Sequence, residues 1–123
     1  MTEQGQFRTR VLIVEDDAFT RALVGESLAN AGMVVKTAEN YAVATEILNE
    51  YEPNVVVSDL DLGPGPSGAD LLTRVHEERP WVGLVALTSH GSATLAVGSG
   101  HELPEGVVYV VKSRMGSISD VQQ

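Results

Sequence analysis

Five short apolar runs alternate with longer amphipathic stretches, and this alternation limits the fold more than any other feature of the sequence. Each run is four to six residues long and most are rich in valine, which is typical of strands buried on both faces. Strands that alternate with helices predict a doubly wound parallel sheet, because crossover connections are right-handed. The expected strands are Val11–Val14, Val34–Ala38, Val55–Ser58, Val82–Leu87 and Val107–Val111.

Three of the intervening stretches carry clear helix signals. Asp17 can cap the first helix, which Gly32 ends, and Asn40 can cap the second, which stops before Pro53. The third ends before Pro80. We expect the following side chains to face the core: Ala22, Leu23, Leu28 and Ala29 in the first helix, Val43, Ile47 and Leu48 in the second, and Leu71, Leu72 and Val75 in the third.

The last part of the chain gives weaker signals. Residues 90–106 are rich in glycine and predict a short or poorly formed fourth helix. Met115–Gln123 resembles the opening of a fifth helix that is short or truncated. Trp81 is expected to pack at the start of the fourth strand.

Composition excludes several classes of protein and site. A chain of 123 residues is one domain in size, and the absence of cysteine excludes disulfides and thiolate metal sites. A net charge of −9 argues against direct nucleic-acid binding. No apolar run approaches the roughly 20 residues that span a bilayer, so no membrane insertion is expected. The N-terminus lacks the apolar core of a secretion signal, which favours a cytoplasmic location.

Polar residues gather where four of the five expected strands end. Glu15 and Asp16 follow the first strand, Asp59 the third, Thr88 the fourth and Lys112 the fifth. Because functional groups of open parallel sheets collect beyond the carboxyl ends of the strands, these side chains are expected to share one crevice.

These residue types suit phosphoryl transfer to a carboxylate. The carboxylates of Asp16 and Asp59, with Glu15 nearby, would repel one another without a cation, and oxygen ligands suit Mg²⁺. The metal would reduce repulsion between Asp59 and an incoming phosphate. Lys112 supplies a compact positive charge, and the Thr88 hydroxyl can donate a hydrogen bond to a phosphoryl oxygen.

Four motifs together resemble the signature of response-regulator receiver domains. They are VLIVEDD, VVVSDLDLGPGPSG, VALTS and YVVKS, and they run in the family's order from Val11 to Lys112. The resemblance implies a flavodoxin-like (βα)₅ fold with strand order 2-1-3-4-5. It also implies that residues 1–123 form a single receiver domain, with no output domain in this chain.

The resemblance assigns the acceptor and its metal ligands residue by residue. Asp59 matches the phosphoacceptor, and Asp16 matches the direct metal ligand. Glu15 matches a partner that usually acts through water. Asp61 matches the position that offers a backbone carbonyl to the metal.

Further roles follow from the same resemblance. Thr88 matches the switch hydroxyl, Lys112 the phosphoryl-binding amine, and Tyr109 the aromatic residue whose rotamer reports activation. Ser89 lies where a small residue gives access to the phosphoryl group. His90, like Asp61, falls at a position that tunes the dephosphorylation rate.

The implied function is a phosphorylation-dependent signalling switch. Asp59 would accept a phosphoryl group from a sensor histidine kinase or phosphotransfer protein, with Mg²⁺ or Mn²⁺, and partner binding would change. Such a regulator is no enzyme beyond assisting its own phosphoryl transfer and dephosphorylation. The family's partner face also implies a phosphorylation-dependent homodimer, while the downstream partner is not specified.

Two departures from the family pattern stand out. The loop after Asp59 is one residue longer than D-x-x-x-P-x-x-x-G. Ser113 follows Lys112 in place of the usual proline, whose peptide bond is typically cis. A cis bond before a residue other than proline costs about 2.5–4 kcal/mol, so this bond is either trans or strained.

Two other functions remain as alternatives. The first is a receiver-like interaction module that phosphorylation does not regulate. The second is a haloacid-dehalogenase-type phosphatase, because Asp59-Leu60-Asp61 resembles that family's D-x-D motif. That motif lies on the first strand of the phosphatase family, whereas here it follows the third, and position 63 is glycine.

Overall fold

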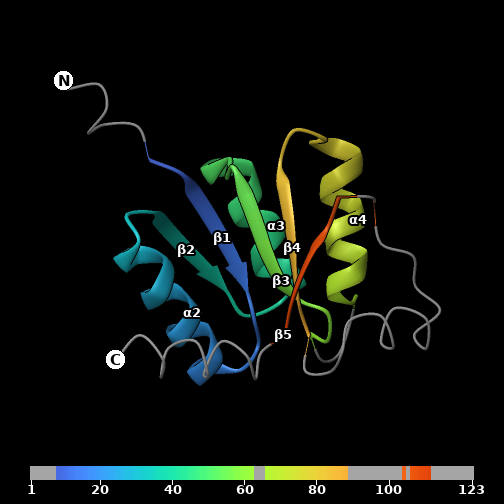
Figure 1. Cartoon of the computed structure of the whole chain (residues 1–123). Helices are drawn as coiled ribbons and strands as arrows, with labels where there is room; N and C mark the ends of the chain where they lie inside the picture. Colours follow the sequence, from blue (N-terminus) through green and yellow to red (C-terminus); the bar gives the residue numbers. More distant parts are fainter. Residues whose placement is uncertain (1–7, 63–65, 89–103, 105, 112–123) are drawn as a thin grey trace.

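The chain folds into a single sheet flanked by helices (Figure 1). In this computed structural model we describe residues 8–62, 66–88, 104 and 106–111. None of the helices in these ranges has the length and apolar character needed to cross a membrane. The elements in chain order are β1 (Arg10–Val14), α2 (Ala18–Asn30), β2 (Val34–Ala38), α3 (Tyr41–Tyr51), β3 (Val55–Asp59), α4 (Gly68–Glu78), β4 (Gly83–Thr88) and β5 (Val108–Val111).

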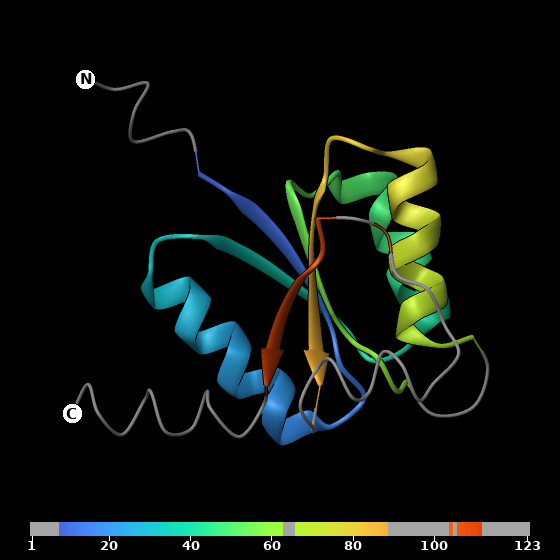
Figure 2. The same cartoon turned by 45° about the vertical axis from the view of Figure 1, so that its right-hand side comes forward.

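All five strands run parallel in the order β2-β1-β3-β4-β5. Figure 2 shows β4 (orange) and β5 (red) side by side and pointing the same way. The order reverses at β1, which lies between β2 and β3. This is the predicted flavodoxin-like, doubly wound sheet, and the prediction of its strand order is confirmed. The predicted fourth helix lies almost entirely outside the described residues, and the short or truncated fifth helix lies wholly outside them.

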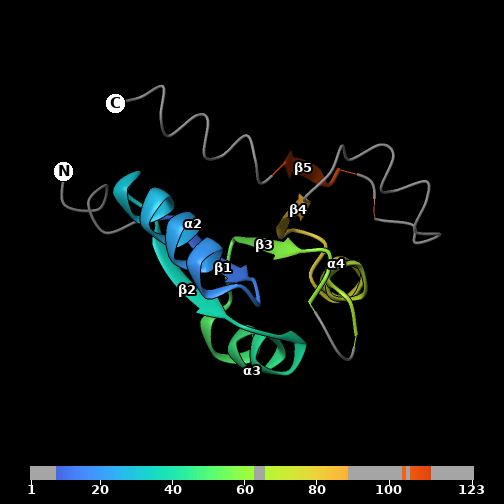
Figure 3. The ribbon, with the colours of Figure 1, turned by 90° about the horizontal axis from the view of Figure 1, so that it is seen from below.

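The sheet has a separate apolar core on each face. Viewed along the strands, α2 covers one face, and α3 and α4 cover the other (Figure 3). Because successive strand residues point to opposite faces, Leu12 and Val14 join the core beneath α3 and α4. Val11 and Ile13 join the second core, together with Val24 of α2. The central strands β1, β3 and β4 are therefore buried on both sides, as their apolar runs predict. The same prediction is wrong for β2 and β5, which lie at the edges of the sheet and expose or only half-bury most of their residues.

The helices begin where the sequence predicts caps. An Asp17 carboxylate oxygen accepts a hydrogen bond from the Thr20 amide at 2.8 Å, and the Asn40 side chain accepts one from the Val43 amide at 2.9 Å. Both caps are confirmed, and both satisfy backbone donors that the first turn of a helix leaves without partners. The cap at Asp17 fixes where α2 leaves the end of β1, next to Glu15 and Asp16.

The inward face of α2 differs from the prediction in two of four residues. Leu28 packs against the core and Leu23 is half-buried, but Ala22 and Ala29 are exposed. The side chain that α2 buries is Val24, which is 3% exposed. Apolar residues surround most of this helix, so their spacing alone does not select one face.

The prediction that Trp81 packs at the start of a strand is wrong. Trp81 is 75% exposed and precedes β4 at the amino ends of the strands. It lines an open pocket of about 310 Å³ together with Glu52, Pro53, Glu78 and Arg79. The neighbouring Val82, which is 5% exposed, makes the core contact instead.

Gly25 in the middle of α2 provides a test of how closely this helix approaches the sheet. A Cβ atom at this position would lie 3.8–3.9 Å from the side chains of Ile13, Val35 and Thr37, which is ordinary van der Waals contact. Because glycine destabilises a helix interior, Gly25→Ala is expected to raise the free energy of unfolding by about 0.5–1 kcal/mol. Urea unfolding followed by circular dichroism measures the change.

The matched control is Gly32→Ala, just after the same helix. Gly32 has a φ of +96°, which alanine adopts only with strain, so this variant is expected to lose stability. A loss of stability in Gly25→Ala as well would mean that α2 lies closer to β1 and β2 than the structure indicates.

Candidate functional site

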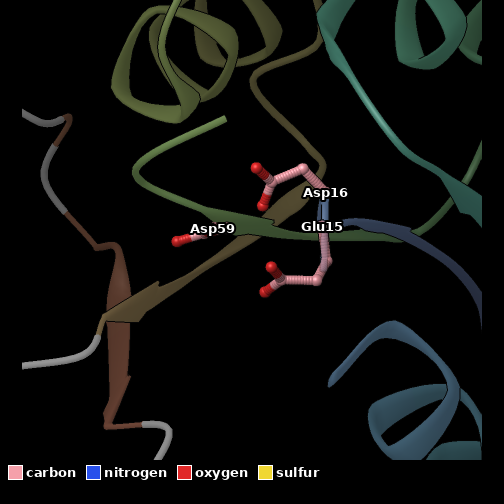
Figure 4. Close-up of side chains that lie close together, drawn as sticks. All are labelled: Glu15, Asp16 and Asp59. Carbon is pink, nitrogen blue, oxygen red and sulfur yellow. The ribbon is translucent and has the colours of Figure 1, made fainter. Parts of the chain in front are cut away.

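Three carboxylates meet at the carboxyl ends of β1 and β3. The strand register pairs Val14 with Ser58, so the residues that follow, Glu15 and Asp59, come level with each other. One carboxylate oxygen from each of Glu15, Asp16 and Asp59 lies within 4.8 Å of the others (Figure 4). We call these three residues the acidic cluster. Glu15 is 0% exposed and Asp59 is 5% exposed, whereas Asp16 is exposed, so the cluster opens to solvent on the Asp16 side.

Glu15 is held by hydrogen bonds to three residues in two neighbouring segments. Its amide donates to the Ala38 carbonyl at 3.0 Å, which extends the β1–β2 pairing. Its Oε2 atom accepts from the Asp17 amide at 3.1 Å, and its main-chain carbonyl accepts from Arg21 Nη1 at 2.8 Å. The position of Glu15 is therefore determined by β2 and by the start of α2.

Asp59 is held in part by the residues next to it in the chain and by the start of α4. The Ser58 hydroxyl donates to the Asp59 carbonyl oxygen at 2.9 Å, and the Asp61 amide donates to Asp59 Oδ1 at 3.2 Å. The α4 helix also begins directly against this carbonyl, because a Cβ atom on Gly68 would lie only 1.7 Å from the Asp59 oxygen. Only glycine allows α4 to start this close to Asp59.

The remaining predicted site residues are only partly within the described ranges. Thr88 is 1% exposed at the carboxyl end of β4, next to β3, so it lies at the same edge of the sheet as Asp59. Asp61 is exposed two residues after Asp59. Tyr109 is half-buried in β5 and packs against the core beneath α3 and α4. The predicted roles of Ser89, His90 and Lys112, and the Lys112–Ser113 bond, lie outside the described residues.

The acidic cluster fits a magnesium ion by the chemistry of its donors. Its three side chains offer only carboxylate oxygens, which are hard ligands that Mg²⁺ and Mn²⁺ prefer. The exposed side at Asp16 leaves access for the water molecules that Mg²⁺ retains. Three carboxylates at this spacing also repel one another, and a divalent cation removes that repulsion.

Three residues at the site were not found by sequence reasoning. Ser58 and Gly68 contact the Asp59 backbone, and Arg21 contacts that of Glu15. Gly68 could have been suspected, because the family pattern after the acceptor ends in glycine. Arg21 has a weaker signal, since it lies one helical turn after the cap Asp17.

Comparison with known proteins identifies the family. The model for the response regulator receiver domain matches residues 11–103. The DNA-binding transcriptional regulator NtrC of Escherichia coli K12 is 33% identical over 89 residues, which are 72% of this chain but 19% of that regulator. The C4-dicarboxylate transport transcriptional regulatory protein DctD of Pseudomonas aeruginosa is 33% identical over 90 residues, 73% of this chain and 19% of that protein. The chain thus spans about a fifth of the length of these relatives.

Solved structures agree with this match at the level of the fold. The chemotaxis protein CheY4 of Vibrio cholerae superposes with a TM-score of 0.72 at 20% identity, covering 94% of this chain and 98% of that one. Receiver domains are regulatory modules of phosphorylation-dependent, two-component signalling. The chain belongs to the response regulator receiver domain family.

Proposed function

We propose that this chain is a signalling switch that accepts a phosphoryl group on Asp59 and thereby changes its binding to a partner. The donor is a sensor histidine kinase or a phosphotransfer protein, and the reaction requires Mg²⁺ or Mn²⁺. The observation that carries the proposal is the acidic cluster, in which Asp59 lies within 4.8 Å of Glu15 and Asp16 at the carboxyl edge of the sheet. At this edge of the sheet, both a cation and a phosphoryl donor could approach the Asp59 carboxylate.

The chemistry proposed for Asp59 is an in-line transfer. One carboxylate oxygen forms a bond to phosphorus while the bond from phosphorus to the donor imidazole nitrogen breaks, and the electron pair leaves with that nitrogen. The product is an acyl phosphate on Asp59. Mg²⁺, when bound, offsets the negative charge of the carboxylates and the phosphoryl group. Glu15 and Asp16 would hold this cation, with the Asp61 backbone carbonyl as the further ligand that we propose.

Two more groups are proposed to bind the transferred phosphoryl group. Thr88 donates its hydroxyl to a phosphoryl oxygen, and its burial at the end of β4 supports this role. Lys112 supplies a positive charge from the residue after β5. Thr88 and Tyr109 then transmit the change as switch residues, while Asp61 and His90 tune the rate of dephosphorylation. Binding of a downstream partner and formation of a dimer would use surfaces of the domain other than the acidic cluster.

The proposed function is tested by direct phosphorylation. The protein is incubated with Mg²⁺ and a small donor, either acetyl phosphate or phosphoramidate, and its intact mass is recorded after acid quenching. The expected result is a gain of one phosphoryl group, which is lost with EDTA and in the Asp59→Asn variant. Asparagine has nearly the same shape as aspartate, so this control removes the nucleophile while retaining the packing around residue 59.

Other outcomes would favour the two alternatives. Rapid hydrolysis of phosphomonoesters that depends on both Asp59 and Asp61 would indicate a phosphatase. A protein that remains unmodified with both donors and with a phosphorylated phosphotransfer domain would be an interaction module that phosphorylation does not regulate. Either result would contradict the switch.

A further inference from the structure

We infer that Arg21 is a positioning residue for the cation site, acting through the peptide bond that joins Glu15 to Asp16. The inference rests on the proposed function of the acidic cluster and adds a residue that the family resemblance does not assign. Arg21 Nη1 donates to the main-chain carbonyl oxygen of Glu15 at 2.8 Å. That oxygen belongs to the planar peptide group linking the two acidic residues.

The first turn of α2 brings Arg21 into this position. Asp17 caps the helix, and the Arg21 amide donates to the Asp17 carbonyl at 2.9 Å. The half-buried guanidinium of Arg21 then returns to Glu15, six residues earlier in the chain. Two hydrogen bonds thus link Glu15 to the start of α2: the Asp17 amide donates to the Glu15 side chain, and Arg21 donates to the Glu15 carbonyl.

The orientation of this peptide group determines whether the carboxylates of Glu15 and Asp16, which are consecutive residues, can lie close to each other and to Asp59. In an extended chain, neighbouring side chains point to opposite sides. Figure 4 shows Glu15 and Asp16 leaving the chain on opposite sides, with both carboxylates turned toward the side where Asp59 lies. Their convergence within 4.8 Å therefore requires a defined orientation of the peptide between them. The hydrogen bond from Arg21 holds that orientation.

If Arg21 acts by positioning the peptide, its loss should weaken Mg²⁺ binding. If it acts only through its charge, its loss should strengthen Mg²⁺ binding. A guanidinium beside a cation site repels the cation, so the loss of its charge alone would strengthen Mg²⁺ binding. Loss of the hydrogen bond instead frees the Glu15–Asp16 peptide and weakens binding. The direction of the change in Mg²⁺ affinity therefore separates the two roles.

The test compares Arg21→Met with Arg21→Lys in the whole chain. Methionine retains the apolar stem but cannot donate, whereas lysine retains the charge and one donor able to reach a carbonyl. Isothermal titration of the metal-free protein with Mg²⁺ gives the dissociation constant. We expect about tenfold weaker binding in Arg21→Met, as is typical when a partner of a metal ligand is lost, and substantial recovery in Arg21→Lys.

The matched control is Arg74→Met. Arg74 is also a helical arginine, but it is exposed on α4, where it bonds to Tyr41 and Glu78. Its loss removes the same charge without touching the β1–α2 turn, so Mg²⁺ affinity should stay within about twofold of the wild type. Equal weakening in both variants would overturn the assignment to Arg21.

A second measurement does not depend on metal binding. The amide nitrogen of Asp16 belongs to the same peptide group, so its NMR shift in the metal-free protein reports the hydrogen bond to the Glu15 carbonyl. We expect this signal to move in Arg21→Met, to stay close to its native position in Arg21→Lys, and to be unchanged in Arg74→Met. If Arg21→Met does not fold, Arg21→Leu, which also cannot donate, replaces it in both measurements.

The outcomes separate this inference from the proposed function. Tighter or unchanged Mg²⁺ binding in a folded Arg21→Met protein overturns the positioning role while leaving the phosphorylation switch intact. A wild-type protein that binds no Mg²⁺ contradicts the proposed function, and the Asp16 amide signal still reports whether Arg21 holds the peptide. An Asp16 signal that does not move in Arg21→Met also overturns the inference.

Discussion

Gly68→Ala is expected to destabilise the protein by about 3 kcal/mol or more, although alanine is the better helix former. The added Cβ atom would lie 1.7 Å from the Asp59 carbonyl oxygen and 2.7 Å from its carbon. Both are backbone atoms of a buried strand end, so no flexible side chain can move to make room. The helix must shift away from β3, or Asp59 must move with its strand.

Urea unfolding followed by circular dichroism measures this loss, and Gly83→Ala is the matched control. A Cβ atom on Gly83 would lie 3.5 Å from the nearest side-chain atom, so this variant should change the free energy of unfolding by less than about 1 kcal/mol. Whatever fraction of Gly68→Ala remains folded should also bind Mg²⁺ more weakly, because Asp59 is displaced. A gain in stability for Gly68→Ala would show that α4 does not begin against the Asp59 carbonyl.

Asp16→Asn is expected to weaken Mg²⁺ binding about tenfold or more and to stabilise the metal-free protein. One charge is removed from three carboxylates that lie within 4.8 Å, which reduces both the attraction for the cation and the mutual repulsion. Because Asp16 is exposed, solvent screens the repulsion, and the expected gain in unfolding free energy is only about 0.5–1 kcal/mol.

Titration with Mg²⁺ and urea unfolding in EDTA measure the two opposed effects. The control is Asp17→Asn, which removes the same charge from the next residue, and asparagine caps α2 as well as aspartate does. Asp17 lies outside the acidic cluster, so its replacement should change Mg²⁺ affinity by less than about threefold. If both variants weaken binding equally, net charge rather than coordination by Asp16 accounts for the affinity.

The sheet was predictable mainly because its central strands, β1, β3 and β4, are buried on both faces. Such strands must be apolar throughout, and each predicted run agrees with a strand to within one residue at either end, as with Val55–Ser58 and the observed Val55–Asp59. Strand order then follows from the family resemblance. The meeting of Glu15, Asp16 and Asp59 was predictable as well, since the carboxyl ends of parallel strands share one edge.

Contacts that depend on backbone approach were not predictable. The short distance between Gly68 and Asp59 depends on how α4 packs against the sheet. The loop that connects them is one residue longer than the family pattern. The outward position of Ala22 and the burial of Val24 depend on the rotation of a helix that is apolar on most sides. In each case packing between elements, rather than local propensity, determines the result.

The exposed position of Trp81 makes intrinsic tryptophan fluorescence a poor reporter of changes at the acidic cluster. Trp81 is the chain's single tryptophan, and its indole is already 75% solvated at the end of the sheet opposite the acidic cluster. Its emission should therefore change little when a cation or phosphoryl group arrives at Asp59, and only modestly when the chain unfolds. An optical sensor of the proposed switch would need its fluorophore at the other end of the strands, for which half-buried Leu60, next to Asp59, offers a position.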